Sequence, residues 1–361
     1  MKNKHGRKSQ KCSITNTAAL QLCAAVLASQ GAMSAHAFEI ESGNSDVKIQ
    51  WDNTLKYSAA SRLQDASGTL LANPNQDDGD RNFGKGLISN RVDLLSEFDV
   101  KYKDHMGGRV SGAAWYDSIY HQTNDNNSPG TANNISVPYN QFNSATRSLH
   151  GGSGEILDAF VYDTDNIGSI PSTIRLGRHT VLYGETLFFG SNGIAGGQAP
   201  IDVVKLLSVP SSQFKEIVRP VKQLSTQFQV KDNLAIGAYY QFEWRKTLIP
   251  DEGSYFSNAD VLDGSERFFL GPPFPPGATL FHTQDQAAKN SGQGGMQLRW
   301  RPSNLDVDLG LYAIRYNEKT AQFYASTFRT GGPLNPAIGE FGNYQRVYPE
   351  GVKAIGLPTS H

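Results

Sequence analysis

A basic stretch near the middle of the chain, residues 200–223, carries cations at a spacing that could select a solute. Its sequence is PIDVVKLLSVPSSQFKEIVRPVKQ, in which Lys215, Arg219 and Lys222 fall at i, i+4 and i+7 and so share one face of a helix. Cations beside a water path favour anionic or carboxylated solutes and disfavour cationic ones. The alternative is that these residues form the solvated face of a surface helix, and the sequence leaves both interpretations open.

Charged residues of both signs also occupy the polar positions of segments with strand-like alternation. If the apolar positions of these strands meet lipid, the charged side chains line an interior, where we expect most of them to form a lattice of cross-strand ion pairs. Four of them complete the set of candidates for a solute path: Arg175, His179, Glu243 and Arg245. The other charges expected to face inward are Lys48, Asp52, Lys56, Arg91, Asp93, Glu97, Asp99, Lys101, Arg109, Arg299, Arg301, Asp306 and Asp308.

Three other features suggest catalytic or metal chemistry, but none has the spacing that such chemistry needs. NQDDGDRN, with Asp77, Asp78 and Asp80, lacks the D-x-[DN]-x-[DN]-G spacing of a calcium loop, so we expect a solvated outer loop there. The histidines after residue 37 show no H-x-x-x-H or similar metal-ligand spacing. HGGSGE has Glu155 where a G-x-S-x-G nucleophile motif needs glycine. We therefore expect no enzyme activity, no metal and no cofactor.

The elements that would position these residues are β-strands, in which side chains alternate with a period of two. In the segment 47–58, VKIQWDNTLKYS, apolar Trp51, Leu55 and Tyr57 alternate with polar Asp52 and Lys56. This alternation predicts an all-β antiparallel protein with strands at about 47–58, 91–103, 109–116, 155–163, 173–183, 224–231, 233–247, 295–301 and 305–316.

The connections between these strands are alternately short and long. Short turns lie at 104–107, 164–172, 231–233 and 302–304, and long connections at about 59–87, 117–154, 184–222, 248–293 and 317–350. This order is typical of outer-membrane β-barrels, whereas a soluble β-sandwich has no reason to keep it. We therefore predict an antiparallel transmembrane β-barrel with a short amphipathic helical insert at 200–222.

The insert cannot be a lipid-facing strand, because Pro200, Pro210 and Pro220 each remove a backbone donor. Helical backbone at membrane depth is tolerated only inside protein or beside water. We expect the insert at the outer mouth or inside the lumen, with one apolar side against the wall or neighbouring loops. The residues expected on that side are Val203, Leu206, Leu207, Phe214, Ile217 and Val218.

The first 37 residues have the features of a cleavable signal peptide. A basic start precedes the apolar stretch 18–28, and Ala35-His36-Ala37 is a small-x-small cleavage site. The apolar stretch is too short to span a bilayer, which needs about 20 apolar residues. We expect the mature chain to begin at Phe38 and to reach the outer membrane of a Gram-negative bacterium.

Removal of this leader would change the thiol content and the charge. Both cysteines, Cys12 and Cys23, would be lost, so we expect neither a disulfide nor a thiolate metal site. Several lysines and arginines but no acid would be lost, which leaves an acidic chain and gives no case for nucleic-acid binding. The rest of the sequence has no run of 18 consecutive apolar residues, which excludes a helical membrane protein.

The strand count and the end of the sequence predict an incomplete barrel. Bacterial single-chain barrels close with an even number of strands and leave no unpaired edge in lipid. The predicted count is odd, and the segment 348–361, YPEGVKAIGLPTSH, begins like a further strand but lacks a terminal alternation ending in Phe or Trp. We expect the barrel domain, 38–361, to be a C-terminally truncated version of a longer barrel that does not close well by itself.

Several stretches resemble one family of Gram-negative outer-membrane proteins, catalogued only as domain of unknown function thirteen-oh-two. The likeness is carried by IRLGRHTVLYGET at 174–186, the basic stretch at 200–221, NLAIGAYYQFEWRKT at 233–247 with GSYFS at 253–257, and VYPEGVKAIG at 347–356. It covers nearly the whole mature chain, although family members continue past this C-terminus. The resemblance implies an outer-membrane location and an association with exporter systems and hydrophobic-compound metabolism, but no settled molecular activity.

Two functions fit these observations. The first is a channel or facilitator for small amphiphilic or hydrophobic solutes, linked to an export or uptake system. Its partners would be outer-membrane lipid, exporter or periplasmic proteins and an unidentified small-molecule solute. The second is a non-transporting surface protein, an adhesin or assembly scaffold, that acts through its long outer loops. An insert inside the lumen favours the channel, and an insert stacked on a filled lumen favours the scaffold.

Overall fold

The computed structural model describes residues 34–184, 194–327, 335–357 and 359–360. Most of the expected signal peptide, residues 1–33, lies outside the described residues. The cleavage site expected before Phe38 falls within the first described strand, which pairs with the next strand from Ser34 to Ile40.

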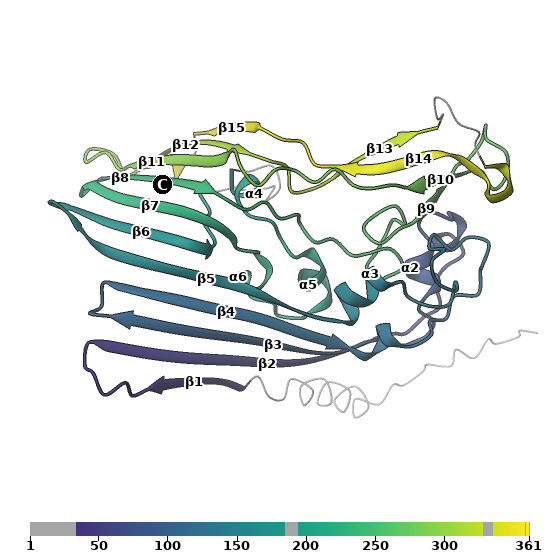
Figure 1. Cartoon of the computed structure of the whole chain (residues 1–361), viewed down its shortest axis with the longest axis horizontal. Helices are drawn as coiled ribbons and strands as arrows, with labels where there is room; N and C mark the ends of the chain where they lie inside the picture. Colours follow the sequence, from purple (N-terminus) through teal and green to yellow (C-terminus); the bar gives the residue numbers. More distant parts are fainter. Residues whose placement is uncertain (1–33, 185–193, 328–334, 358, 361) are drawn as a thin grey trace, which may run out of the picture.

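The main sheet is antiparallel and has 12 strands, which lie side by side mostly in chain order (Figure 1). Along the sheet the order is β1-β2-β3-β4-β5-β6-β7-β8-β11-β12-β15, and β16 pairs with the beginning of β12. The strands are β1 (Ser34–Ile40), β2 (Val47–Arg62), β3 (Gly86–Tyr102), β4 (Met106–Asp117), β5 (Gly152–Ile167), β6 (Ile170–His179), β7 (Val221–Lys231), β8 (Leu234–Gln241), β11 (Gln293–Trp300), β12 (Asp308–Tyr316), β15 (Val352–Gly356) and β16 (Thr359–Ser360).

All nine strands expected from the alternation are present, as β2 to β8, β11 and β12. Their two faces also agree with the alternation. One face carries apolar rows that cross the sheet, such as Val161, Leu176, Leu224 and Tyr240, which pair in register from β5 to β8. These side chains are exposed, between 38% for Leu224 and 60% for Val161. The sheet therefore presents an unburied apolar surface on its outer side.

The opposite face carries the charges that the sequence places there. Asp99 pairs in register with Arg109, and the Arg109 Nε lies 2.7 Å from Asp99 Oδ1. Arg91 forms an ion pair of 2.7 Å with Asp93 on the same strand and is buried. Part of this inner face is apolar, since Leu95, Ala113 and Leu157 form a buried cluster on it.

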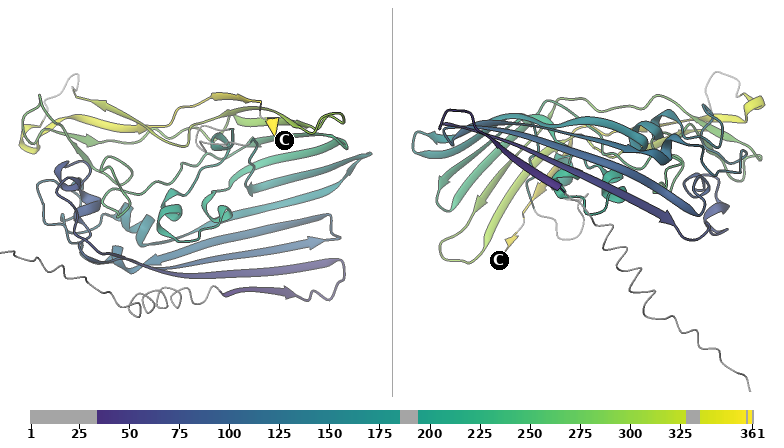
Figure 2. Two further views of the ribbon diagram at one scale, coloured as in Figure 1. Left: turned by 180° about the vertical axis from the view of Figure 1, so that it is seen from behind. Right: turned by 90° about the horizontal axis from the view of Figure 1, so that it is seen from below.

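The main sheet is not closed into a barrel. Its edges are β1 and β15, which do not pair with each other among the described strands. The sheet is curved, as Figure 2 shows from two further sides. The helices that follow β6 lie on its inner side, between strands from the two ends of the sheet (Figure 1). None of the described helices is long and apolar enough to span a membrane.

At one end of the strands the long connections fold into an ordered layer, which we call the loop cap (Figure 1). It contains a second sheet of four strands in the order β13-β14-β10-β9, which the alternation did not predict. The strands are β9 (Arg267–Phe269), β10 (Thr279–His282), β13 (Gln322–Ser326) and β14 (Glu340–Val347). Short helices complete it: η1 (Leu70–Ala72), α2 (Asp78–Arg81), η2 (Ser118–His121), α3 (Ser144–Thr146), η3 (Arg147–Gly151) and η5 (Pro336–Ile338).

The loop cap has its own core, in which Phe83, Ile88, Tyr120 and Phe142 are buried together. The expectation of a solvated loop at NQDDGDRN is therefore wrong. Asp77 and Asp78 are 0% and 1% exposed, because segments from other long connections cover them.

The insert is not one amphipathic helix over 200–222. It contains α5 (Val203–Ser208) and α6 (Phe214–Ile217), after α4 (Ile194–Gln198). The chain turns between α5 and α6 at Pro210 and Ser211, and Ser211 has a φ of +56°. Ile201 and Val218 then form an antiparallel bridge, and β7 begins at Val221. The single cationic stripe of Lys215, Arg219 and Lys222 therefore does not exist, because only Lys215 is helical.

Candidate functional site

The insert lies against the inner face of the main sheet. Lys56 of β2 and Glu216 of α6 form an ion pair of 2.6 Å in which both side chains are less than 10% exposed. The Lys215 Nζ lies 2.5 Å from Glu97 Oε2 of β3. Asp202 caps α5 by accepting a hydrogen bond from the backbone N–H of Lys205 at 2.8 Å. These contacts place α5 and α6 inside the curve of the sheet.

The packing side of the insert differs from the expected one. Val204, Val209 and Val218 are buried, at 2%, 4% and 5% exposure. Leu206, Leu207 and Phe214, which the helical spacing places on the covering side, are exposed at 50%, 46% and 63%. The break at Pro210 rotates the two short helices relative to one another, so a single helical periodicity does not describe both.

Two of the expected path residues, Arg219 and Arg245, serve a different role. Arg219 Nη2 donates to Glu155 Oε2 at 3.0 Å, and Arg245 Nη2 donates to the same oxygen. Each arginine also holds backbone, since Arg219 donates to the carbonyl of Lys246 at 2.9 Å and Arg245 to that of Pro220 at 3.2 Å. This pair anchors the end of the insert to β5 and is not free to meet a solute.

Three expected residues do come together with the insert, around a cavity of about 250 Å³ that we call the insert groove. They are Arg175, His179 and Lys215. The remaining lining residues are Arg109, Asp158, Phe160, Thr180, Phe214, Val218 and Pro220. The groove thus combines aromatic surface from Phe160 and Phe214 with four basic side chains.

Arg175 is the cation of the groove that makes no ion pair among the described residues. Its guanidinium lies 5.9 Å from the ring centroid of Phe160. A second cavity, of about 390 Å³, adjoins the groove, because Arg175 and Thr180 line both. Arg299, which also forms no ion pair among the described residues, lines that second cavity. Arg175 therefore borders both cavities.

His179 supports the wall of the groove through hydrogen bonds. It is 1% exposed, with Nε2 at 2.7 Å from Ser225 Oγ and Nδ1 at 3.1 Å from the carbonyl oxygen of Gly177. Both ring nitrogens have partners within the sheet. The imidazole therefore fixes β6 against β7 beside Arg175.

The last two expected residues, Lys222 and Glu243, do not line the groove. Lys222 pairs in register with Arg178, on the face of the sheet opposite to His179. Glu243 forms an ion pair of 2.7 Å with Arg178 and accepts a hydrogen bond from the backbone N–H of Lys222 at 3.0 Å. Neither residue faces the insert groove as expected. β7 begins before Lys222, so strand alternation turns its side chain outward, and Glu243 is held by its ion pair with Arg178.

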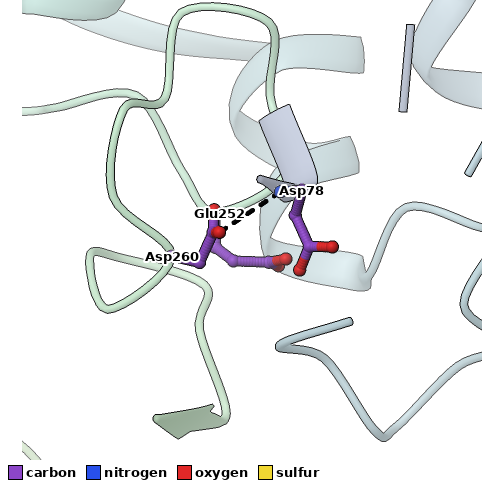
Figure 3. Close-up of side chains that lie close together, drawn as sticks. All are labelled: Asp78, Glu252 and Asp260. Carbon is purple, nitrogen blue, oxygen red and sulfur yellow. Dashed lines mark hydrogen bonds between the residues drawn. The ribbon is translucent and has the colours of Figure 1, made fainter. Parts of the chain in front are cut away.

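A second concentration of charge lies in the loop cap and consists of Asp78, Glu252 and Asp260, which we call the acidic cluster (Figure 3). All three are at least 98% buried, and one oxygen from each lies within 4.8 Å of the others. The backbone N–H of Asp78 donates to Asp260 Oδ2 at 3.2 Å. Burial raises the pKa of Asp260 to about 8, and the charge of Asp78 acts in the same direction. Burial also raises the pKa of Glu252 well above its usual value, and the charge of Asp78 again adds to the shift.

Comparison with known proteins places the chain by family. A family model described as a protein of unknown function, DUF1302, matches residues 18–361. The chain belongs to the DUF1302 family. This match confirms the resemblance that the strand and insert stretches indicated. No curated protein and no solved structure matches the chain.

In this DUF1302 chain, sequence reasoning missed residues for two different reasons. Phe214 was assigned to the packing side because one helix was assumed on both sides of Pro210. The acidic cluster joins residues up to 182 positions apart, since Asp78 contacts Asp260. No local spacing could indicate it, although a run of acids in NQDDGDRN marks one of its two segments.

Proposed function

We propose that the main sheet forms part of the wall of an outer-membrane β-barrel that passes small amphiphilic anions along its inner face. The exposed apolar rows support a lipid-facing outer surface, because isolated exposed apolar residues are common but contiguous bands are not. Strands β2, β3 and β5 have 16, 17 and 16 residues, more than the 9–11 that a tilted transmembrane strand needs. The short turns and the loop cap lie at opposite ends of these strands (Figure 1).

In lipid, unpaired backbone groups at a sheet edge cost several kcal/mol each. The proposed wall therefore needs β1 and β15 to be paired, with each other or with further strands. The location proposed is the outer membrane of a Gram-negative bacterium, reached through a cleaved signal peptide. Exporter or periplasmic proteins are the partners proposed for a channel that serves export or uptake.

One observation carries the channel proposal: the insert groove lies between α6 and the inner face of the sheet, inside the curve. A carboxylate or sulfate group suits the unpaired guanidinium of Arg175, which presents a fork of donors to such a group. Phe160 and Phe214 offer an apolar surface for the rest of the solute, and Phe214 is 63% exposed. Lys215 and Arg109 are already paired with Glu97, so they contribute less to binding.

The experiment compares two neutralised cations in planar lipid bilayers. Arg175→Gln changes the groove, and Lys222→Gln changes a cation on the opposite face of the sheet. We expect the wild-type protein, in a form in which β1 and β15 are paired, to conduct with a preference for anions, Arg175→Gln to lose that preference, and Lys222→Gln to keep it. A wild-type chain that inserts without conducting would contradict the channel, and an equal change in both variants would contradict the role of the groove.

A second candidate is a surface protein, an adhesin or assembly scaffold. The ordered loop cap favours it, because long connections with a separate core and a four-stranded sheet form a stable surface. The bilayer experiment separates the two functions, since a scaffold conducts no more than its lipid background. A scaffold would also keep partner binding in Arg175→Gln and lose it when the loop cap is altered.

A further inference from the structure

We propose that the acidic cluster of the loop cap, Asp78, Glu252 and Asp260, binds a divalent cation, and that this cation is Ca²⁺. The ion would join the connection between β2 and β3 to the connection between β8 and β11. This site is separate from the insert groove and does not depend on the proposed transport.

The spacing of the three carboxylates suits one ion. Oxygens bound to calcium lie 2.3–2.6 Å from it, so two ligands on opposite sides of the ion are about 5 Å apart. One oxygen each from Asp78, Glu252 and Asp260 lies within 4.8 Å of the other two. Figure 3 shows the three side chains converging from two segments of the loop cap.

Unpartnered oxygens in this cluster give a second and independent indication of a ligand. Glu252 Oε1 and Asp260 Oδ1 are buried without a hydrogen-bond partner, in side chains that are 2% and 0% exposed as residues. Asn133, whose backbone N–H donates to Asp78 Oδ2 at 2.6 Å, also has a buried side-chain oxygen without a partner. Buried polar atoms normally have partners, so several unpartnered oxygens at one place indicate a missing cation or donor.

The acidic cluster differs from other buried carboxylates of the described chain in its lack of an ion-paired cation. Among the described residues, no lysine or arginine forms an ion pair with Asp78, Glu252 or Asp260. The neighbouring Asp77 does have one, since Arg81 contacts its Oδ2. A buried carboxylate without a partner is very costly, and a divalent ion would offset most of the charge of the three.

The backbone segments around the acidic cluster lie close enough together to enclose a cation. Carbonyl oxygens of Ser254 and Ser257 approach Gly79 so tightly that a Cβ there would lie 2.7 and 2.6 Å from them. The segment 252–260 therefore wraps directly over Asp78 and its neighbour, and only glycine permits this approach. A site made of oxygens alone, largely closed to water, suits Ca²⁺ better than Mg²⁺, which usually keeps several waters.

The test is a calorimetric titration of the full chain in detergent micelles, stripped with a chelator and titrated with CaCl₂. We expect one Ca²⁺ per chain, and weaker binding of Mg²⁺. Glu252→Gln and Asp260→Asn should each lower the Ca²⁺ affinity by at least about tenfold, since loss of even an outer-shell partner of a metal costs that much. The matched control is Asp80→Asn, which changes an acid of the same motif that pairs with Arg62 and lies outside the cluster.

Absence of a binding heat up to millimolar Ca²⁺ would overturn the proposal, as would an unchanged affinity in Glu252→Gln. Tighter binding of Mg²⁺ than of Ca²⁺ would overturn the choice of ion. Because a variant can lose binding by losing its fold, protease digestion of the loop cap is followed in parallel. We expect Ca²⁺ to slow cleavage of the wild-type chain and of Asp80→Asn but not of Glu252→Gln, whose rate without Ca²⁺ should not exceed that of the wild type. Equal effects of Ca²⁺ on all three chains would contradict the site.

Discussion

The insert and the loop cap both bury carboxylates, but they neutralise them in different ways. Beneath the insert, Glu155 contacts both Arg219 and Arg245, and Glu97 contacts Lys215 and Arg109. Each of these carboxylates contacts two cations of the same chain. These two carboxylates are therefore neutralised within the protein, while Arg175 and Arg299 form no ion pair among the described residues.

The acidic cluster of the loop cap has the opposite balance. Asp78, Glu252 and Asp260 lie together without a lysine or arginine as ion-pair partner among the described residues. Either a proton or a bound cation must lower the cost of burying them. A glutamate should therefore stabilise the fold beneath the insert and destabilise it in the acidic cluster. The same Glu→Gln substitution at the two places tests this difference.

The largest effect is expected for Glu155→Gln. This change leaves two guanidinium groups, each 15% exposed or less, without their shared carboxylate. Breaking a buried ion pair by removing one partner lowers the free energy of unfolding by about 3–5 kcal/mol. Urea unfolding in detergent micelles measures it. The control is Glu350→Gln in the exposed pair with Lys289, where a comparable loss would be unexpected.

The next largest effect is a loss of stability at acidic pH, which we attribute to His150 in the loop cap. His150 is 1% exposed, and burial lowers its pKa to about 3 from 6.5. Below pH 6.5 the His150 imidazole binds a proton in the unfolded chain but not in the folded chain. The free energy of unfolding therefore falls as the pH decreases from about 6.5 toward 3. Linkage gives a loss of about 2 kcal/mol between pH 7 and pH 5.

The measurement for His150 is the difference between wild type and His150→Gln at each pH. This difference is needed because Asp260, with a raised pKa, acts in the opposite direction and gains stability as the pH falls. We expect the wild type to lose stability relative to the variant on acidification. A difference that stays constant from pH 7 to pH 5 would show that His150 is not buried in its neutral form.

A smaller effect of opposite sign is expected for Glu252→Gln in the absence of Ca²⁺. The change removes a carboxyl group that, once buried without a cationic partner, must either carry an unpaired charge or take up a proton. The free energy of unfolding should therefore rise by about 1–2 kcal/mol. The same Glu→Gln substitution destabilises the chain at Glu155. If both substitutions destabilise it by similar amounts, the contrast between the two regions is wrong.

The smallest effect on stability is expected for Phe214→Ala, because this side chain is 63% exposed in the groove. Its free energy of unfolding should change by less than about 0.5 kcal/mol, while Val204→Ala on the packing side of the insert should cost about 2 kcal/mol. Binding of decanoate, measured by calorimetry, should weaken in Phe214→Ala only. If Val204→Ala weakened decanoate binding equally, the proposal that decanoate binds in the groove would be contradicted.

The strands of the main sheet could be predicted from the sequence, because the alternation of apolar and polar residues depends only on neighbouring positions. Trp51 of β2 and Phe98 of β3 both fall on apolar positions of the alternation, and they pair in register. The contacts that define the site are not local. Glu155 meets Arg219 and Arg245 across 64 and 90 residues, and no spacing rule connects them.

The insert shows where local reasoning fails. Three cations at helical spacing predict one stripe only if the helix continues, but α6 ends at Ile217. Lys222 then follows the period of a strand and turns outward, while Lys215 stays on the groove. Arg175 lines the groove as well, because its place on the inner face depends on strand alternation alone.

The most direct test of the contrast is thermal unfolding of the wild type, Glu155→Gln and Glu252→Gln, each with Ca²⁺ and with a chelator. Ligand at 100 times its dissociation constant stabilises a protein by about 2.7 kcal/mol. We predict that Ca²⁺ raises the unfolding temperature of the wild type and of Glu155→Gln but not of Glu252→Gln. An equal rise in all three chains, or no rise in the wild type, would contradict the claim that the loop cap needs an ion where the inner face does not.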